Sequence, residues 1–327
     1  MSVLTFADAS NGKLKKSTLE ATFFAHQIAS KTNGKVVVLL YKGNDESKQK
    51  LAQAGANKII NITNEINNIS DFHVIARLIH KYALSENVKD IVLSFDTQGR
   101  AVSSYLAGML NGGIVSGVTS LLDINNDVYK FKKNVFSGKA VATISISGSP
   151  KVITLLPNSL QVQMNANNTA EITDVEEKDN YSSKITIKSI EKNDTGGSIP
   201  LPEAELVVSG GRGLKGPENW GIVEELAKVL GAATACSRPV ADSHWRPHHE
   251  HVGQTGLTIR PNLYIAIGIS GAIQHLAGVS GSKTIVVINT DKDAPFFKSA
   301  DYGIVGDAFE VVPKLTQAIK KFKETHQ

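Results

Sequence analysis

The sequence predicts an α/β protein of two domains, the first mainly a parallel sheet with an antiparallel extension and the second a Rossmann-like parallel sheet. Up to about residue 110, short β-rich runs alternate with amphipathic helical patterns, as in a parallel sheet covered by helices. From about 114 to 192 only strand-like runs follow, and the α/β alternation begins again near 205. The 327 residues are enough for two cores of ordinary domain size.

In the first domain, four strands are expected to alternate with four helices. The strand-like runs are 3–8, 35–41, 58–62 and 90–95, and the helical patterns are about 17–31, 46–54, 72–85 and 99–110. The later strand-like runs, which would form the antiparallel extension, are 128–136, 139–147, 151–157 and 183–190. The polar, Asn-rich stretch 164–183 is interpreted as a surface connection.

A domain boundary is indicated where glycines and prolines gather at 193–205, ahead of a new apolar strand. We place it near 195–202, which gives domains 1–197 and 203–327. Helices are expected in the second domain at about 218–230, after Gly271 and at 310–323. Its strand-like runs are 205–211, 231–238, 263–268, 284–289 and 301–307.

Composition narrows the function classes. With 41% hydrophobic and 20% charged residues, and no run near the roughly 18 apolar residues that span a bilayer, we expect a soluble bacterial cytoplasmic protein without stable membrane insertion. The net charge of +4 is small, so the lysines at 13–16 and 130–133 are interpreted as solvated, with no nucleic-acid partner. A single cysteine, Cys236, excludes internal disulfides and is a weak candidate nucleophile.

The ends of the five second-domain strands are rich in glycine and polar residues. Because ligands of an open parallel sheet bind beyond the carboxyl ends of its strands, these five segments together outline one elongated crevice. They are 209–216, 236–239, 268–271, 289–291 and 306–307.

The third of these segments is suited to an anion. Gly268 and Gly271 allow close backbone approach, and Ser270 with the N–H groups of Gly271 and Ala272 would form a helix start that favours phosphate. Yet the run lacks the G-x-G-x-x-G spacing of a dinucleotide fingerprint. The turn therefore indicates a phosphate without saying which one.

Arginine and acceptor side chains add to the crevice. Arg212 and Arg238 could pair with phosphate or with a ring that becomes anionic, although surface arginines are common. Asn289 and Asp307 could accept from ribose or adenine, or could simply form turns.

A long connection between the second and third strands carries 251–256, in which glycines bracket Gln254 and Thr255. If a planar redox ring lies in the crevice, Thr255 could bond a ring nitrogen and His275 could stabilise charge on the pyrimidine side. From spacing alone, a helical His275 bonded to a neighbouring carbonyl is at least as good an interpretation.

Taken together, several motifs resemble the α subunit of electron transfer flavoproteins. They are SGGRGL (209–214), SR (237–238), VGQTG (252–256), LYIAIGISGAIQHLAG (263–278), INTDKDAPFF (288–297) and ADYGIVGD (300–307). The resemblance covers essentially all of the second domain, and its GISGAIQH block is very specific. In the first domain it rests on general architecture, with 93–107 as the closest local match.

The resemblance implies noncovalent FAD in the second domain, and a nucleotide-hydrolase-like first domain that serves as scaffold for a β subunit in a heterodimer. Arg238 would lie against the isoalloxazine, Thr255 near its N5, His275 near its C2 carbonyl and Asp307 near the adenine, tuning the flavin without catalytic or metal-binding residues. The implied FAD contacts are Arg212, Ser237, Arg238, Val252, Gly253, Gln254, Thr255, Ser270, Gly271, Ala272, Ile273, Gln274, His275, Asn289 and Asp307.

The family role that the resemblance implies is to accept electrons from dehydrogenases, such as the acyl-CoA dehydrogenases of fatty acid β-oxidation, and to pass them to a quinone oxidoreductase. A nicotinamide-dependent oxidoreductase and a non-redox nucleotide-binding module remain as alternatives. Against the first stands the missing fingerprint with its acidic ribose reader.

One stretch, 242–256, departs from the family pattern because it is rich in histidine. His244, His248, His249 and His251 suggest a metal site, but no cysteine accompanies them and their spacing matches no standard zinc motif. We expect them instead to alter the surface beside the flavin or the contact with a partner.

Overall fold

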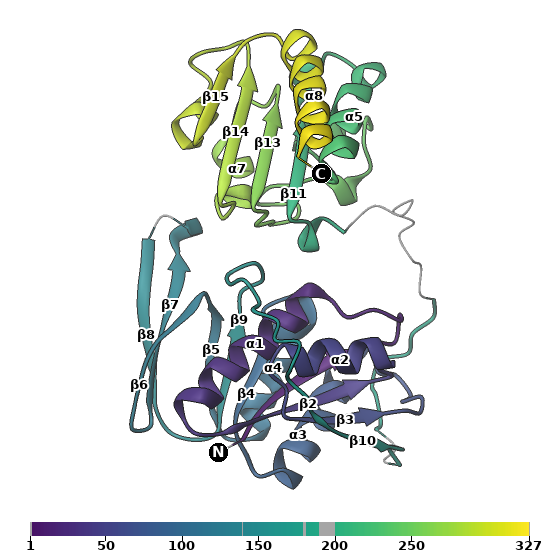
Figure 1. Cartoon of the computed structure of the whole chain (residues 1–327), viewed down its shortest axis with the longest axis vertical. Coiled ribbons are helices and arrows are strands. Elements are labelled where there is room, and N and C mark those ends of the chain that lie inside the picture. Colours follow the sequence, from purple (N-terminus) through teal and green to yellow (C-terminus); the bar gives the residue numbers. More distant parts are fainter. Residues whose placement is uncertain (1, 139, 179–180, 190–199, 327) are drawn as a thin grey trace. The chain divides into compact units, whose positions relative to one another are not determined.

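The computed structural model describes residues 2–138, 140–178, 181–189 and 200–326. The chain separates into two compact units, Met1–Glu191 and Lys192–Gln327 (Figure 1). The boundary expected near 195–202 falls largely on residues 190–199, which lie outside the described residues, so its position stays a prediction.

A seven-stranded, wholly parallel sheet forms the centre of the first unit, in the order β10-β3-β2-β1-β4-β9-β5. The strands are β1 (Ser2–Asp8), β2 (Lys35–Tyr41), β3 (Lys58–Ile62), β4 (Val88–Ser94), β5 (Gly113–Val118), β9 (Lys151–Leu155) and β10 (Glu171–Val175). In β2, every residue after Lys35 is buried, because a parallel sheet is covered on both faces.

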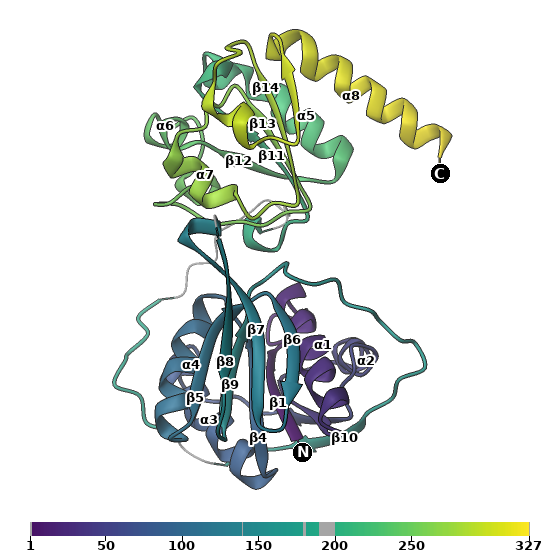
Figure 2. The same cartoon turned by 90° about the vertical axis from the view of Figure 1, so that its left-hand side faces the viewer.

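Helices cover both faces of this sheet. Figure 2 shows α3 and α4 on one side and α1 and α2 on the other, and each side has its own apolar core. Asn44, Asp71 and Asp96 cap the starts of α2, α3 and α4 by accepting a hydrogen bond from a backbone N–H of the first turn. The helices are α1 (Lys16–Lys31), α2 (Asp45–Gln53), α3 (Phe72–Ser85) and α4 (Thr97–Met109).

Two of the predicted antiparallel strands, β7 (Val128–Val135) and β8 (Ala140–Ile146), are present in a three-stranded sheet whose third strand, β6 (Ser120–Asn125), was not predicted. Tyr129 and Phe131 of β7 are buried in the same core as α1, and the Tyr129 hydroxyl donates to Asp90 Oδ2 of β4 at 2.7 Å. The small sheet is therefore fixed on the large one by both apolar and polar contacts.

Two assignments in this unit were wrong. The run 151–157 was expected among the antiparallel strands, but as β9 it lies between β4 and β5 in the parallel sheet, where all five of its residues are buried. The run 183–190 was expected to be a strand, but its described residues, 183–189, form none.

The sheet's last strand is instead β10, which arises within the polar connection. It is an exposed edge strand that pairs with β3, and Asp174 accepts from Asn61 Nδ2 at 2.7 Å and lies 3.2 Å from Lys48 Nζ. An edge strand needs no apolar alternation, so the pattern did not reveal it.

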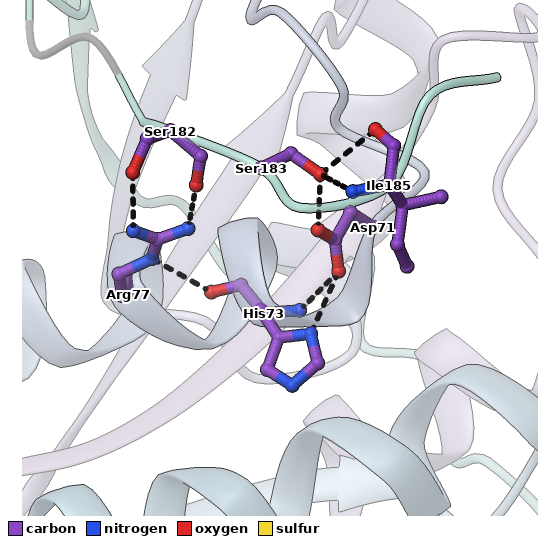
Figure 3. A network of polar contacts seen from close by, with 6 residues as sticks. All are labelled: Asp71, His73, Arg77, Ser182, Ser183 and Ile185. Atoms are coloured by element: carbon purple, nitrogen blue, oxygen red, sulfur yellow. Dashed lines mark hydrogen bonds and ion pairs between the residues drawn. The ribbon is translucent and has the colours of Figure 1, made fainter.

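Polar contacts, not strand pairing, hold the segment after residue 180 against α3 (Figure 3). Asp71 Oδ2 accepts from the Ser183 hydroxyl at 2.5 Å, and Arg77 donates to the backbone oxygen of Ser182. Asp71 Oδ1 also accepts from the backbone N–H of His73 at 2.9 Å. Although burial acts to raise it, the hydrogen bonds from Ser183 and His73 hold the pKa of Asp71 below its usual range.

Five parallel strands form the sheet of the second unit, in the order β12-β11-β13-β14-β15. They match the five predicted runs: β11 (Leu206–Gly210), β12 (Ala233–Cys236), β13 (Leu263–Ile267), β14 (Thr284–Asn289) and β15 (Tyr302–Val305). The helices α5 (Gly221–Leu230) and α8 (Ala308–Thr325) pack together on one face, and α7 (Ile273–Val279) covers the other (Figure 2).

Short helices complete the described chain. They are α6 (Arg238–Asp242) and the 3₁₀ turns η1 (Phe136–Gly138), η2 (Leu201–Glu203), η3 (Arg212–Leu214), η4 (Pro217–Asn219), η5 (His248–Glu250) and η6 (Pro295–Ser299). Within the described residues, no helix is both long and apolar enough to span a bilayer.

The strand order of the second unit has a consequence for binding. The chain passes from β11 to β12 on one side and then to β13 on the other side of β11. At such a switch point, the loops after the two central strands turn in opposite directions and leave a crevice. A ligand is therefore expected to bind at the turns after β11 and β13.

Candidate functional site

A cavity of about 580 Å³ lies at this switch point, within the range of roughly 300–1,000 Å³ that is typical of small-molecule sites. Segments that follow β11, β12, β13 and β14 line it, together with the loop around 251–255. By contrast, the switch point of the first sheet, between β1 and β4, has a cavity of about 30 Å³, which holds a few waters at most. Among the described residues, a nucleotide-sized ligand therefore fits in the second unit.

The floor of the crevice is built by glycines of two turns that touch through their backbones. Gly213 N–H donates to Gly268 O at 3.0 Å, and a Cβ on Gly213 would lie 2.7 Å from Gly268 Cα. Gly268 has a φ of +62°, which glycine adopts without strain. A side chain at either position would force the β11 and β13 turns apart.

The β13 turn continues through a second tight position, Gly271, with a φ of +84° and the ring of Phe296 where a Cβ would stand. The Asn289 side-chain amide donates to Ile269 O at 3.0 Å and so ties this turn to the end of β14. Ser270 and Ala272 are exposed at the cavity, and no side chain caps α7. The backbone N–H groups at this position are thus available to an anionic ligand.

Two arginines supply positive charge to the cavity wall. Arg212 opens η3, directly after β11, and is exposed. Arg238 is the first residue of α6; its side chain is 62% exposed and its Nε donates to Asp242 Oδ2 at 3.2 Å. Both guanidinium groups are already exposed at the cavity and can therefore contact a ligand there.

The 251–256 loop is fixed at both of its sides. Val252 N–H donates to Cys236 O at 3.1 Å, at the end of β12, and Gln254 N–H donates to Gln274 O at 2.7 Å, in α7. Gln254 and Thr255 are exposed and line the cavity. The backbone that presents these two side chains is thus anchored to the sheet and to α7.

Two histidines stand in the wall of the cavity, each with 7% of its surface exposed. The Nε2 atom of His275 lies 2.8 Å from the hydroxyl of the fully buried Tyr264, and its Nδ1 is withdrawn beside the backbone of Val252. Burial lowers the pKa of His275 to about 4, so the ring is neutral at pH 7. Both ring nitrogens of His275 are thus enclosed by protein. The contact between His275 and a flavin carbonyl stays a prediction.

The other wall histidine, His251, was considered in the sequence only as part of a metal cluster. It pairs with Cys236 in an isolated bridge, which brings its ring under the 251–256 loop. Burial lowers its pKa, with smaller effects of opposite sign from Asp242 and Arg238.

Most residues that the resemblance singled out meet at this cavity. All of them line it except Ile273, which is exposed, and Asp307, whose carboxylate caps α8 by accepting from Phe309 N–H at 2.9 Å. The fifth strand end, 306–307, thus lies outside the lining. Gly268, which was expected to approach a phosphate, lines the cavity as well, and the structure adds Gly213, Pro239, His251, Ile269 and Asp291, which had not been assigned as contacts.

Arg246 fastens the histidine-rich stretch to the core. Its guanidinium donates to both Glu250 carboxylate oxygens at 2.6 and 2.9 Å and to Glu224 of α5 at 3.0 Å, and it lies over the Trp220 ring. Across the described part of the chain, no three His, Cys, Asp or Glu side chains converge as metal ligands do. Cys236 is buried, which raises the pKa of its thiol to about 12 and leaves it unreactive.

Comparison with known families agrees with this geometry. Residues 3–180 match the model of the electron transfer flavoprotein domain, and residues 200–280 match the electron transfer flavoprotein FAD-binding domain. The second match spans β11 to β13, the 251–256 loop and α7, which together carry most of the cavity wall.

Among curated proteins, the electron transfer flavoprotein subunit alpha of Thermoanaerobacterium thermosaccharolyticum is 37% identical over 325 residues, 97% of each chain. The corresponding subunits of Bacillus subtilis and Pseudomonas aeruginosa are 35% and 33% identical and cover 98% of this chain and 97% and 100% of their own. The match to a glycosyltransferase structure from Rickettsia africae covers 98% of this chain and 87% of that chain, but its TM-score of 0.29 and 14% identity are too low to indicate a shared fold. The chain therefore belongs to the electron transfer flavoprotein alpha-subunit family, and its second unit is an FAD-binding domain of that family.

Proposed function

We propose that this chain is the FAD-bearing subunit of a heterodimeric electron transfer flavoprotein that accepts electrons from dehydrogenases and passes them on toward a quinone oxidoreductase. The observation that carries the proposal is the cavity at the β11/β13 switch point. It is large enough for a dinucleotide-like ligand, lies in the FAD-binding domain, and has a glycine floor between two accessible arginines.

The residues of the cavity suit the separate parts of FAD. The glycine turns after β11 and β13 let a pyrophosphate approach the backbone, and Arg212 can offset its charge. At the other side, Arg238 places a cation and Thr255 a hydroxyl where a planar ring can lie. When bound, FAD supplies the one- and two-electron chemistry, and these side chains orient it and set the charge around it.

A positive charge beside the ring has a definite effect on electron uptake. Because Arg238 stabilises an anionic ring nearby more than a neutral one, it favours the reduced cofactor and raises the reduction potential of the flavin. The ion pair with Asp242 at 3.2 Å holds the guanidinium at the rim and partly offsets its charge. We infer that this chain tunes its cofactor and turns over no substrate of its own.

The partners follow from the same proposal. We propose a β subunit as the second member of the heterodimer, with the first unit as its scaffold, and acyl-CoA or other dehydrogenases as donors. The complex would act in the bacterial cytoplasm, and a single cysteine, buried at the end of β12, suits such a reducing compartment.

The test is to purify the chain together with its β subunit, add FAD and remove the excess. We expect a yellow complex whose flavin absorbance is bleached by a dehydrogenase reduced with its acyl-CoA substrate, and restored by a quinone oxidoreductase with quinone. A complex that stays colourless after FAD is added would contradict the proposal.

A further inference from the structure

His251 lines the cavity, whereas the other histidines of the same stretch, His244, His248 and His249, do not. Its ring lies beneath the loop that presents Gln254 and Thr255, with Nε2 3.4 Å and Nδ1 2.8 Å from where Cβ atoms on Gly253 and Gly256 would stand. Neither ring nitrogen has a hydrogen-bond partner among the described residues. Neither is among the fully buried polar atoms that lack a partner, so both keep some access to solvent. The ring can therefore gain a proton without breaking an existing bond.

The neighbouring imidazole differs in this respect. His275 is close enough to affect the charge of His251, but its Nε2 faces the Tyr264 hydroxyl at 2.8 Å, and its Nδ1 is buried away from solvent. Of the two wall histidines, only His251 is thus arranged to exchange a proton with the cavity.

Few charges face His251 from the elements around it. On α6 stand Arg238 and Asp242, which form an ion pair with each other; η5 contributes His248, α7 contributes His275, and β12 contributes the neutral thiol of Cys236. Burial keeps the ring neutral while the cavity carries no added negative charge, since burial is the largest effect on its pKa. A negative charge added to the cavity would raise the pKa of His251, and water screens this effect little because the ring is buried in the cavity wall.

We propose that His251 takes up a proton when FAD in this cavity is reduced, so that electron uptake by this chain is coupled to proton uptake at His251. The electron comes from the reduced partner, or from dithionite in a titration, and the proton comes from solvent. One N–H bond forms on the imidazole and no bond in the protein breaks, so that one positive charge on His251 balances one negative charge added to the cavity. This inference rests on the proposed FAD site.

The test compares the pH dependence of the flavin potential in the FAD-loaded heterodimer with that of two variants, His251→Gln and His249→Gln. His249 is the matched control, because it is exposed in the same stretch and does not line the cavity. Full coupling of one proton to one electron changes the potential by about 59 mV per pH unit. We expect wild type and H249Q to show the same slope, and H251Q to lose up to that amount in the range where His251 titrates.

A second measurement keeps the inference testable if H251Q fails to fold or to bind FAD. In the wild-type complex labelled with ¹⁵N-histidine, the ring nitrogens of His251 should change from the neutral to the protonated pattern on reduction at neutral pH. Unchanged His251 signals, or an H251Q slope equal to that of wild type, would overturn the inference while FAD binding stands. A wild-type complex that binds no FAD would overturn the proposed function itself.

Discussion

Replacing Gly213 with alanine tests the crevice floor at its tightest point. The new Cβ would lie 2.7 Å from Gly268 Cα, 2.8 Å from its oxygen and 3.1 Å from its carbonyl carbon, all backbone atoms that cannot rotate away. The two turns must then separate by several tenths of an ångström. Overpacking of this kind costs about 1–3 kcal/mol, and lengthening the bond from Gly213 N–H to Gly268 O costs up to about 1 kcal/mol more.

A smaller effect of the opposite sign comes from the unfolded chain, which loses entropy when alanine replaces glycine, about 0.4–1 kcal/mol. We therefore expect Gly213→Ala to destabilise the second unit by about 1–3 kcal/mol in urea unfolding. FAD affinity, measured by quenching of flavin fluorescence, should fall by about tenfold or more, because each 1.4 kcal/mol lost from the binding geometry is a factor of ten.

The matched control is Gly221→Ala, at the start of α5, where a Cβ would meet no atom within 4 Å. This variant should bind FAD like wild type and be as stable or slightly more stable. If G213A unfolds and binds FAD as G221A does, the backbone contact between the two turns does not shape the site, and the reasoning is refuted.

Three further predictions concern His275, Asn289 and Arg246. Because burial lowers the pKa of His275 from 6.5 to about 4, the unfolded chain binds a proton on this ring before the folded chain does as the pH falls. The free energy of unfolding should therefore be unaffected above pH 6.5 and decline by up to about 3 kcal/mol between pH 6.5 and 4. His275→Gln should flatten that decline in urea unfolding measured across this pH range. Asn289→Ala removes the donor to Ile269 O and should cost about 1 kcal/mol of stability and weaken FAD binding severalfold in fluorescence titrations. Arg246→Lys cannot reproduce the two-point contact with Glu250, so amide hydrogen exchange should quicken across 246–251 while α8 keeps its protection.

Each of these predictions has an outcome that would contradict it. For His275, it is an H275Q protein that declines with falling pH as steeply as wild type. For Asn289, it is a coincident FAD titration, which would mean that the β13 turn holds its shape without the amide. For Arg246, it is exchange in 246–251 that lysine leaves unchanged, because the stretch would then be fixed by other contacts.

Much of the site could be predicted because the carboxyl ends of parallel strands share one edge of a sheet. From that rule alone, the segments after β11, β12, β13 and β14 were predicted to lie together, and all four line the cavity. The fifth segment lies outside the cavity lining and the Asp307 carboxylate caps α8, so its place near the adenine stays a prediction. A capping side chain and a ligand contact look alike in sequence, since both are polar residues that follow a strand.

What could not be predicted are contacts that join distant parts of the chain. The approach of Gly213 to Gly268 and the pairing of His251 with Cys236 depend on strand order and register, which local periodicity does not contain. The same limit explains why β9 was placed in the wrong sheet and β10 was missed, since a strand's partners decide its role. The strands β5 and β6 and the short helix α6 were not predicted either, whereas the other α-helices and strands of both units followed from apolar spacing.

The most direct test of the FAD site in the second unit is the hydrogen exchange of the heterodimer, measured with and without FAD and resolved by segment. We expect FAD to slow amide exchange at 209–216, 252–256 and 268–275, the segments that build the cavity of the second unit, and to leave the β1/β4 switch point of the first unit unchanged. A complex that binds no FAD, or one in which FAD protects the first unit and leaves these segments unchanged, would contradict it.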